Sequence, residues 1–187
     1  TAFEWGRLKM QASVLGYFVH EKVERFEARP DKAVATPAFF GSFKVLKNHD
    51  LSVRAFYKRM FRMPTFNDLY YTDMGNAFLK PEYAEQFNVG LKYTRNFEKS
   101  PFMRMLDVSV DAYYNKITDK IIAYPKGQQF RWTMLNLGEV EIKGVDAVLN
   151  ALFTLGKLEV TTKFQYTYQK AIDITDPADT YYRDQIP

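Results

Sequence analysis

Cysteine is absent from the 187 residues, and long apolar runs are missing as well. Without thiols, the chain can form neither a disulfide framework nor a thiolate metal site. Its two histidines, His20 and His49, lie far apart and show no metal-ligand spacing. No apolar run approaches the roughly 18 residues of a transmembrane helix. This does not exclude a membrane protein, because barrel strands give a much weaker hydropathy signal than helices.

Charge of one sign is not concentrated anywhere in the chain. The formal net charge is only +4, with Lys and Arg scattered among Asp and Glu. A basic stripe of the kind that binds nucleic acid is therefore missing. The sequence also has no phosphate-binding glycine loop and no Ser-His-Asp arrangement. Asp107 and Asp111 share one strand face, but nothing marks them as an acid–base couple. We therefore predict no enzyme activity, no cofactor, no metal site and no nucleic-acid partner.

The two ends of the sequence favour an internal segment of a longer protein. Residues 1–5 lack the charged and apolar regions of a signal peptide. The last residues, 181–187, form a polar stretch typical of a loop rather than of a terminal strand. We expect the chain to be an excised piece that would not function by itself.

Aromatic residues are abundant, at 17% of the chain with 13 Tyr and 16 Phe. This richness is typical of the interfacial girdles of a membrane barrel, although soluble binding modules can also be rich in tyrosine.

Alternation of polar and apolar residues is the main structural signal. In residues 157–169, one parity runs from Leu158 through Phe164 to Tyr168, while the other is polar. Because successive side chains of a strand point to opposite faces, this pattern predicts a two-faced strand. Similar alternation predicts further strands at residues 7–18, 37–46, 51–58, 86–93, 106–115 and 145–151.

The strands of a soluble β-sandwich also show alternating polar and apolar residues. Strand length and connection length therefore have to distinguish a membrane barrel from a sandwich. Several segments reach the roughly 9–11 residues of a membrane-spanning strand. Short connections at 47–50, 95–101 and 154–157 alternate with long ones at 21–36, 59–82, 119–132 and from 171 onward. Outer-membrane barrels show this asymmetry between their two ends. We therefore predict an all-β, antiparallel up-and-down transmembrane β-barrel segment, with residues 7–20 running outward.

The connection after residue 60 contains the most specific motif. It reads Phe61-Arg62-Met63-Pro64, then Asp68-Leu69-Tyr70, Gly75-Asn76 and Leu79-Lys80-Pro81-Glu82. Asn136-Leu137-Gly138 and Gly144-Val145-Asp146 follow in the same order as in a known family. Over residues 51–152 this pattern resembles that of TonB-dependent outer-membrane receptors, with Asp146 where that family usually has Glu.

The resemblance implies a barrel of about 22 strands, plugged by an N-terminal domain that this chain lacks. Residues 1–187 would form part of one barrel domain, with roughly seven or eight strands. The implied function is TonB-dependent uptake of a scarce nutrient across the bacterial outer membrane, with cargo such as a ferric siderophore, cobalamin, haem or a glycan. The implied partners are the lipid bilayer, the cargo, and the TonB complex through regions outside this chain. A passive porin-like barrel and a soluble β-sandwich binding module remain as alternatives.

The motif residues allow two interpretations. They could bind a ligand, or they could brace a long loop through turn chemistry and an Arg–carboxylate pair. We favour the bracing role for Arg62, Pro64, Asp68, Gly75, Asn76, Pro81 and Glu82. Arg54, Asp107, Asp111 and Lys163 are expected to point into the lumen.

Aromatic residues in the expected outer loops are the candidates for cargo binding. Their rings could stack on a ligand or join the interfacial girdle, since both uses follow from the same amphipathic ring. These candidates are Tyr70, Tyr71, Tyr124, Phe130, Trp132, Tyr181 and Tyr182.

Overall fold

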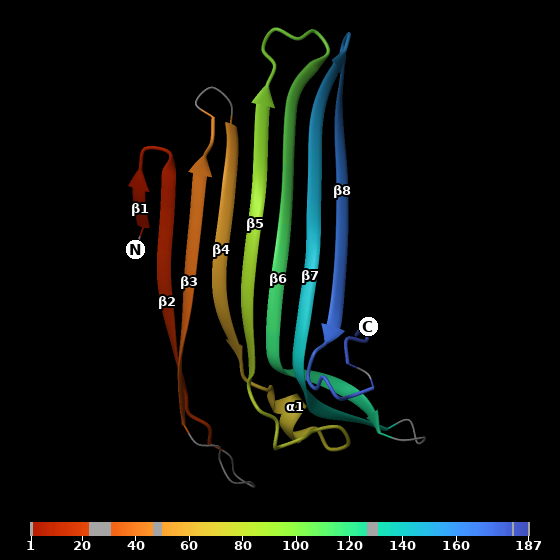
Figure 1. The fold of residues 1–187 in the computed structure, drawn as a ribbon. Helices are drawn as coiled ribbons and strands as arrows, with labels where there is room; N and C mark the ends of the chain where they lie inside the picture. The colour runs from red at the N-terminus through yellow and green to blue at the C-terminus, as the bar shows by residue number, and fades with distance from the viewer. Residues whose placement is uncertain (1, 23–30, 47–49, 127–130, 181, 187) are drawn as a thin grey trace.

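The chain folds into one antiparallel sheet in which every strand pairs with its sequence neighbours (Figure 1). The structure, a computed structural model, describes residues 2–22, 31–46, 50–126, 131–180 and 182–186. The strands are β1 (Ala2–Trp5), β2 (Leu8–Val19), β3 (Lys32–Lys44), β4 (Asp50–Arg62), β5 (Glu82–Asn96), β6 (Met103–Lys126), β7 (Arg131–Leu155) and β8 (Leu158–Asp173). A short helix, α1 (Phe66–Tyr70), lies between β4 and β5.

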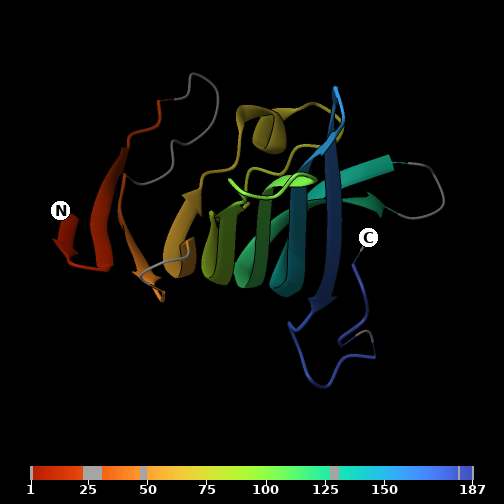
Figure 2. The ribbon, with the colours of Figure 1, turned by 90° about the horizontal axis from the view of Figure 1, so that it is seen from above.

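The sheet curves but does not close, because its order runs from β1 to β8 and these two strands remain at its edges (Figure 2). Unpaired edges expose backbone donors and acceptors, which is costly in lipid and in water. The predicted fold class is confirmed: the chain is an all-β, up-and-down antiparallel segment of an incomplete barrel.

The strand register separates the side chains into two faces. The face called here the polar face carries Arg54, Asp107, Asp111 and Lys163, which the register places on the same side of the sheet. The opposite side is the apolar face. It includes Phe164, Tyr166 and Tyr168, whose exposed fractions are 61%, 53% and 55%. Such a face contradicts a sandwich core, where these side chains would be packed against a second sheet.

The strands are longer than predicted at one end of the sheet. Residues 32–36, 59–62 and 171–173, which the sequence places in connections, belong to β3, β4 and β8. The largest correction concerns residues 119–132, which were expected to form a long loop. Most of them extend β6 and β7 as a paired ribbon, with Tyr124 opposite Thr133 and Pro125 opposite Trp132. Pairing between the two strands satisfies the backbone polar groups of these residues, which an irregular loop would leave to water or to side chains.

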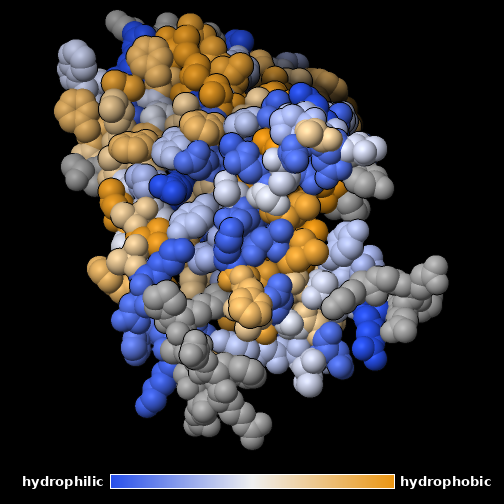
Figure 3. All heavy atoms as spheres, turned by 60° about the horizontal axis from the view of Figure 1, so that its bottom comes forward, coloured by the Kyte–Doolittle hydropathy of each residue, from blue (hydrophilic) through white to orange (hydrophobic). Residues whose placement is uncertain are grey.

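The long-connection end of the sheet holds the connections after β2, β4, β6 and β8. The opposite end is the short-turn end. At the short-turn end, Gly6 and Gly156 adopt φ of +59° and +65°, a region that residues with a Cβ rarely occupy. They allow tight turns between β1 and β2 and between β7 and β8. Seen toward the long-connection end, hydrophilic residues gather in the centre of Figure 3, and hydrophobic residues dominate the upper part of the view.

Buried apolar residues form two small clusters near the long-connection end. One contains Leu69, Leu79 and Ile121 and fixes the connection between β4 and β5 onto β6. The other contains Ala84, Ile117 and Val140, with Ile186 packed against it. In the part of the chain that the structure describes, no helix is long and apolar enough to cross a membrane.

Candidate functional site

A bidentate ion pair crosses the middle of the polar face. Arg54 on β4 donates from Nε to Asp111 Oδ1 at 3.1 Å and from Nη2 to Asp111 Oδ2 at 2.5 Å. Gly90 on β5 lies between them in the register, and a Cβ at this position would collide with the carboxylate of Asp111. The missing side chain therefore lets Arg54 reach across one whole strand. Two parallel, charge-assisted hydrogen bonds fix both side chains more firmly than a single contact would.

A second polar network surrounds Asp107, nearer the short-turn end of the same face. Thr94 donates from Oγ1 to Asp107 Oδ2 at 2.7 Å, and Asn150 donates from Nδ2 to Asp107 Oδ1 at 3.4 Å. Lys92 Nζ lies 3.5 Å from the same carboxylate. Lys163, which pairs with Asn150 in the register, continues this row on β8. All four side chains predicted to face the lumen thus lie on one face, together with the partners that satisfy the two aspartates.

We predict that Asp111→Asn lowers the stability of the full-length protein by about 1–2 kcal/mol, because Arg54 loses the charge of its partner. Thermal unfolding in detergent measures the change. Asp146→Asn is the matched control: Asp146 pairs with Asp111 in the register, and no ion pair to it is found among the described residues. Equal losses for the two variants would contradict a specific role for the Arg54–Asp111 pair.

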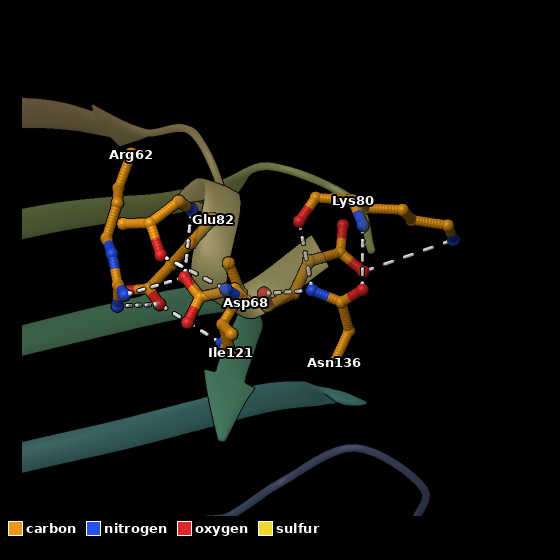
Figure 4. Close-up of polar contacts among 8 residues, drawn as sticks. Arg62, Asp68, Lys80, Glu82, Ile121 and Asn136 are labelled. Carbon is orange, nitrogen blue, oxygen red and sulfur yellow. Dashed lines mark hydrogen bonds and ion pairs between the residues drawn. The ribbon is translucent and has the colours of Figure 1, made fainter. Parts of the chain in front are cut away.

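The connection between β4 and β5 is held by Arg62 at its start and Glu82 at its end (Figure 4). Arg62 lies 3.4 Å from Asp68 Oδ2 and 3.6 Å from Glu82 Oε2. Glu82 also accepts a hydrogen bond of 3.1 Å from the backbone N–H of Ile121 on β6. One guanidinium therefore joins both ends of the connection and the first turn of α1.

Asp68 has a second role at the beginning of α1. Thr65 Oγ1 accepts a hydrogen bond from the N–H of Asp68 at 3.2 Å, and Asp68 Oδ2 accepts one from the N–H of Thr65 at 2.9 Å. This reciprocal arrangement is a capping box, with Asp in place of the usual Glu or Gln, and it satisfies N–H groups that a helix start leaves unpaired. Pro64 immediately precedes it, where the fixed φ of proline restricts the turn.

Two asparagines fasten the same connection to β7. Asn136 accepts from the N–H of Lys80 at 2.8 Å and donates to the carbonyls of Lys80 at 3.0 Å and Asp119 at 2.8 Å. Asn76 donates to the carbonyl of Met134 at 3.0 Å and accepts from the N–H of Phe78 at 3.0 Å. Pro81 follows Lys80 and leads into β5. The motif residues of this connection are thus gathered around one braced loop.

The aromatic candidates are distributed more widely. Tyr71, Tyr124 and Trp132 are exposed, the last two on the ribbon formed by the ends of β6 and β7. Tyr70 is half-buried against Leu69 and donates to Glu21 Oε1 at 3.1 Å. Tyr182 is half-buried in the segment after β8. Phe130 and Tyr181 lie outside the described residues.

Sequence reasoning missed two exposed phenylalanines of the same connection. Phe78 is 92% exposed, and Phe66 is 66% exposed with its ring centroid 6.1 Å from that of Tyr70. It also missed a hollow of about 240 Å³ between the end of β2 and α1, lined in part by His20, Met63 and Phe66. Phe78 lies in a connection, where no alternation of residues marks it, and the hollow depends on contacts between segments more than 40 residues apart. Within the described ranges, no group of three acidic, histidine or cysteine side chains could hold a metal ion.

Comparison with known proteins agrees with this geometry. Residues 11–187 match the family model "TonB dependent receptor-like, beta-barrel". The vitamin B12 transporter BtuB of Vibrio vulnificus is 34% identical over 99 residues, which cover 53% of this chain and 14% of that protein. The vitamin B12 transporter BtuB of Photobacterium profundum is 34% identical over 113 residues, or 57% of this chain and 16% of that protein.

Among solved structures, the copper transporter OprC superposes with a TM-score of 0.58 at 17% identity, over 90% of this chain and 26% of that one. At this level of sequence identity, the similarity to OprC concerns the fold alone. The chain spans about one-sixth or less of the length of the two BtuB relatives. These relatives are transporters, not enzymes. With a family model that matches nearly its whole length, the chain belongs to the TonB-dependent receptors and forms part of their β-barrel.

Proposed function

We propose that this chain forms barrel wall and extracellular loops of an outer-membrane receptor that imports a scarce nutrient with energy supplied through TonB. The observation that carries the proposal is the two-faced sheet, with an exposed apolar face and a hydrogen-bonded polar face, that ends in one braced loop system. TonB contact would come from regions outside this chain. The long connections would bind the small-molecule or glycan cargo.

The apolar face supports a position in a bilayer. Tyr57, Phe87 and Tyr114 form an aromatic row across β4, β5 and β6, with ring centroids 4.9 and 6.2 Å apart. One row closer to the long-connection end, the register places the charged residues Arg59, Glu85, Lys116 and Glu141. An aromatic row followed by a charged row is the order expected where hydrocarbon gives way to headgroups. The long-connection end would then face the exterior.

The loops offer two features to a cargo molecule. The exposed rings of Phe66, Tyr71, Phe78 and Trp132 provide stacking surfaces at the long-connection end, and the hollow near His20 provides a concave one. Ferric siderophores, cobalamin, haem and glycans all offer surfaces that such rings can contact. The BtuB relatives are vitamin B12 transporters, so cobalamin is the first cargo to test.

A bacterial strain that lacks the full-length receptor provides the test. Restoring the receptor should restore uptake of one labelled cargo from a panel of cobalamin, haem, ferric siderophores and oligosaccharides. Removing TonB from the same strain should abolish that uptake, because the active receptor depends on transmitted energy. TonB-independent uptake, together with a large steady conductance in planar bilayers, would instead indicate the passive porin.

A further inference from the structure

The pairing between β3 and β4 ends before either strand does. Their register ends with Ala38 opposite Lys58, although β3 also contains residues 32–37 and β4 continues through residues 59–62. Over the same stretch, β3 remains paired with β2, and β4 remains paired with β5. The sheet therefore divides between β3 and β4 at the long-connection end, where the ends of β2 and β3 run apart from β4 (Figure 1).

Pro37 explains where the division begins. Val45, directly after β3, donates its N–H to the carbonyl of Leu51 on β4 at 2.8 Å. Successive residues of a strand bond to opposite neighbours, and Pro37 has the same parity as Val45. The nitrogen of Pro37 therefore faces β4, where a continued register would place Arg59. Because proline has no N–H, the ladder loses a donor at the position where the pairing stops.

The end of the β2–β3 hairpin beyond this point, residues 14–22 and 31–37, is called the arm. Its two strands stay joined to each other by the register between β2 and β3. Thr36, which is buried, also donates from Oγ1 to the carbonyl of Leu15 at 3.2 Å. The arm is thus a unit with its own backbone and side-chain bonds.

Side chains connect the arm to β4 and to α1 across the division. The ring centroid of Tyr17 lies 5.8 Å from that of Phe61, and Lys32 Nζ lies 5.7 Å from the same Phe61 centroid. The hydroxyl of Tyr70 donates to Glu21 Oε1 at 3.1 Å. Ring–ring and cation–π contacts are weak individually compared with a backbone ladder, so they can break and form again while both sides stay folded.

The arm forms one side of the hollow of about 240 Å³ beside α1. Val19, His20, Glu21 and Lys22 line the hollow from the arm, and Met63, Pro64, Phe66 and Leu69 line it from the connection after β4. A small rotation of the arm therefore changes the width of this hollow without disturbing either wall.

We propose that the arm hinges at Pro37 and its register partner Val14, and that this motion opens and closes the hollow beside α1. The proposal rests on the proposed function, in which the hollow is one of the surfaces offered to cargo. Hinges are a few residues at the ends of elements that absorb a change of backbone direction. The moving part is a pair of strand ends, so it keeps its shape while its position changes.

The test measures distances between two spin labels in the full-length receptor in detergent, by pulsed electron–electron double resonance without cargo. Ala33→Cys places one label on the arm, and Asp73→Cys places the other on the connection after β4; both positions are exposed. The native receptor should give a broad distribution with an open and a closed population. Pro37→Ala supplies an N–H toward β4, so the ladder can extend and the distribution should narrow at least about twofold. Tyr17→Ala should shift it toward longer distances.

Two controls isolate the hinge. Lys44→Cys in place of Ala33→Cys puts the label at the other end of β3 and should give one narrow distance. Pro125→Ala removes a proline from β6, away from the division, and should leave the Ala33–Asp73 label distribution at its native width. A single narrow distance for the native arm, or an unchanged width in Pro37→Ala, would overturn the proposal.

Cargo uptake by the same variants is a separate measurement. Pro37→Ala should slow the uptake of whichever panel cargo the native receptor imports several-fold, because the hollow opens less often. Native uptake in a Pro37→Ala receptor with a narrowed distribution would refute the gating role of the arm. A native receptor that imports no cargo of the panel would count against the proposed function alone, since the distances are measured without cargo.

Discussion

Replacing Gly144 with alanine is expected to destabilise the barrel wall by about 1–3 kcal/mol, the cost of inserting a group into a filled space. Tyr113 on β6 extends across Gly144 on β7, and its hydroxyl donates to Gln169 Oε1 on β8 at 3.0 Å. A Cβ at residue 144 would collide with the Tyr113 ring and would lie 2.6 Å from the carbonyl oxygen of Tyr168. The ring would have to move, and the bond to Gln169 would be lost with it.

Thermal unfolding of the full-length receptor in detergent measures this effect. Gly41→Ala is the matched control, because Gly41 lies within β3 and a Cβ there would meet no atom within 4 Å. It should be neutral or slightly stabilising, since alanine restricts the unfolded chain more than glycine does. Adding Tyr113→Ala to Gly144→Ala should recover only part of the loss, because the contact with the Tyr168 carbonyl remains. A Gly144→Ala variant as stable as Gly41→Ala would show that Tyr113 is not held at this position.

Gly144 and Gly90 use the same arrangement on the polar face. Tyr113 passes over Gly144 to reach β8, and Arg54 passes over Gly90 to reach Asp111. In each case a long side chain links strands that are not neighbours, and the strand between them has no side chain to obstruct it. The strand register is what aligns these residues, so neither link could be derived from the alternation of residues along a single strand.

The fold and the site could be predicted from the sequence only where the signal is local to one segment. Alternation identified the cores of seven strands, including residues 157–169 of β8, because the period of a strand is a local property. It missed β1, with four residues, and the ends of β6 and β7, where Asp119 adopts a φ of +55° and the alternation is interrupted. The Arg62–Asp68 contact could be anticipated from a motif within one connection. The bonds from Asn136 to Lys80 and Asp119 could not, because they join segments 56 and 17 residues apart.

Gly75→Ala is expected to loosen the connection between β4 and β5 more than any polar substitution within it. A Cβ at this position would lie 2.6 Å from the backbone nitrogen of Tyr71 and 2.7 Å from the carbonyl oxygen of Leu69. These are main-chain atoms of the α1 C-terminus, so no side-chain rotation can relieve the contact. The backbone would have to shift, and with it the 2.7 Å hydrogen bond from the N–H of Gly75 to the carbonyl of Tyr71.

Limited proteolysis of the full-length receptor in detergent detects this shift, because a displaced loop exposes backbone that the native structure protects. We expect cleavage within residues 63–81 to accelerate about tenfold or more, the effect of about 1.4 kcal/mol on a local opening equilibrium. Asp73→Ala, at an exposed position of the same connection, should be cleaved at the native rate. Native cleavage rates in Gly75→Ala would mean that the turn after α1 can accommodate a Cβ, and that the brace around Arg62 and Asn136 alone holds the loop.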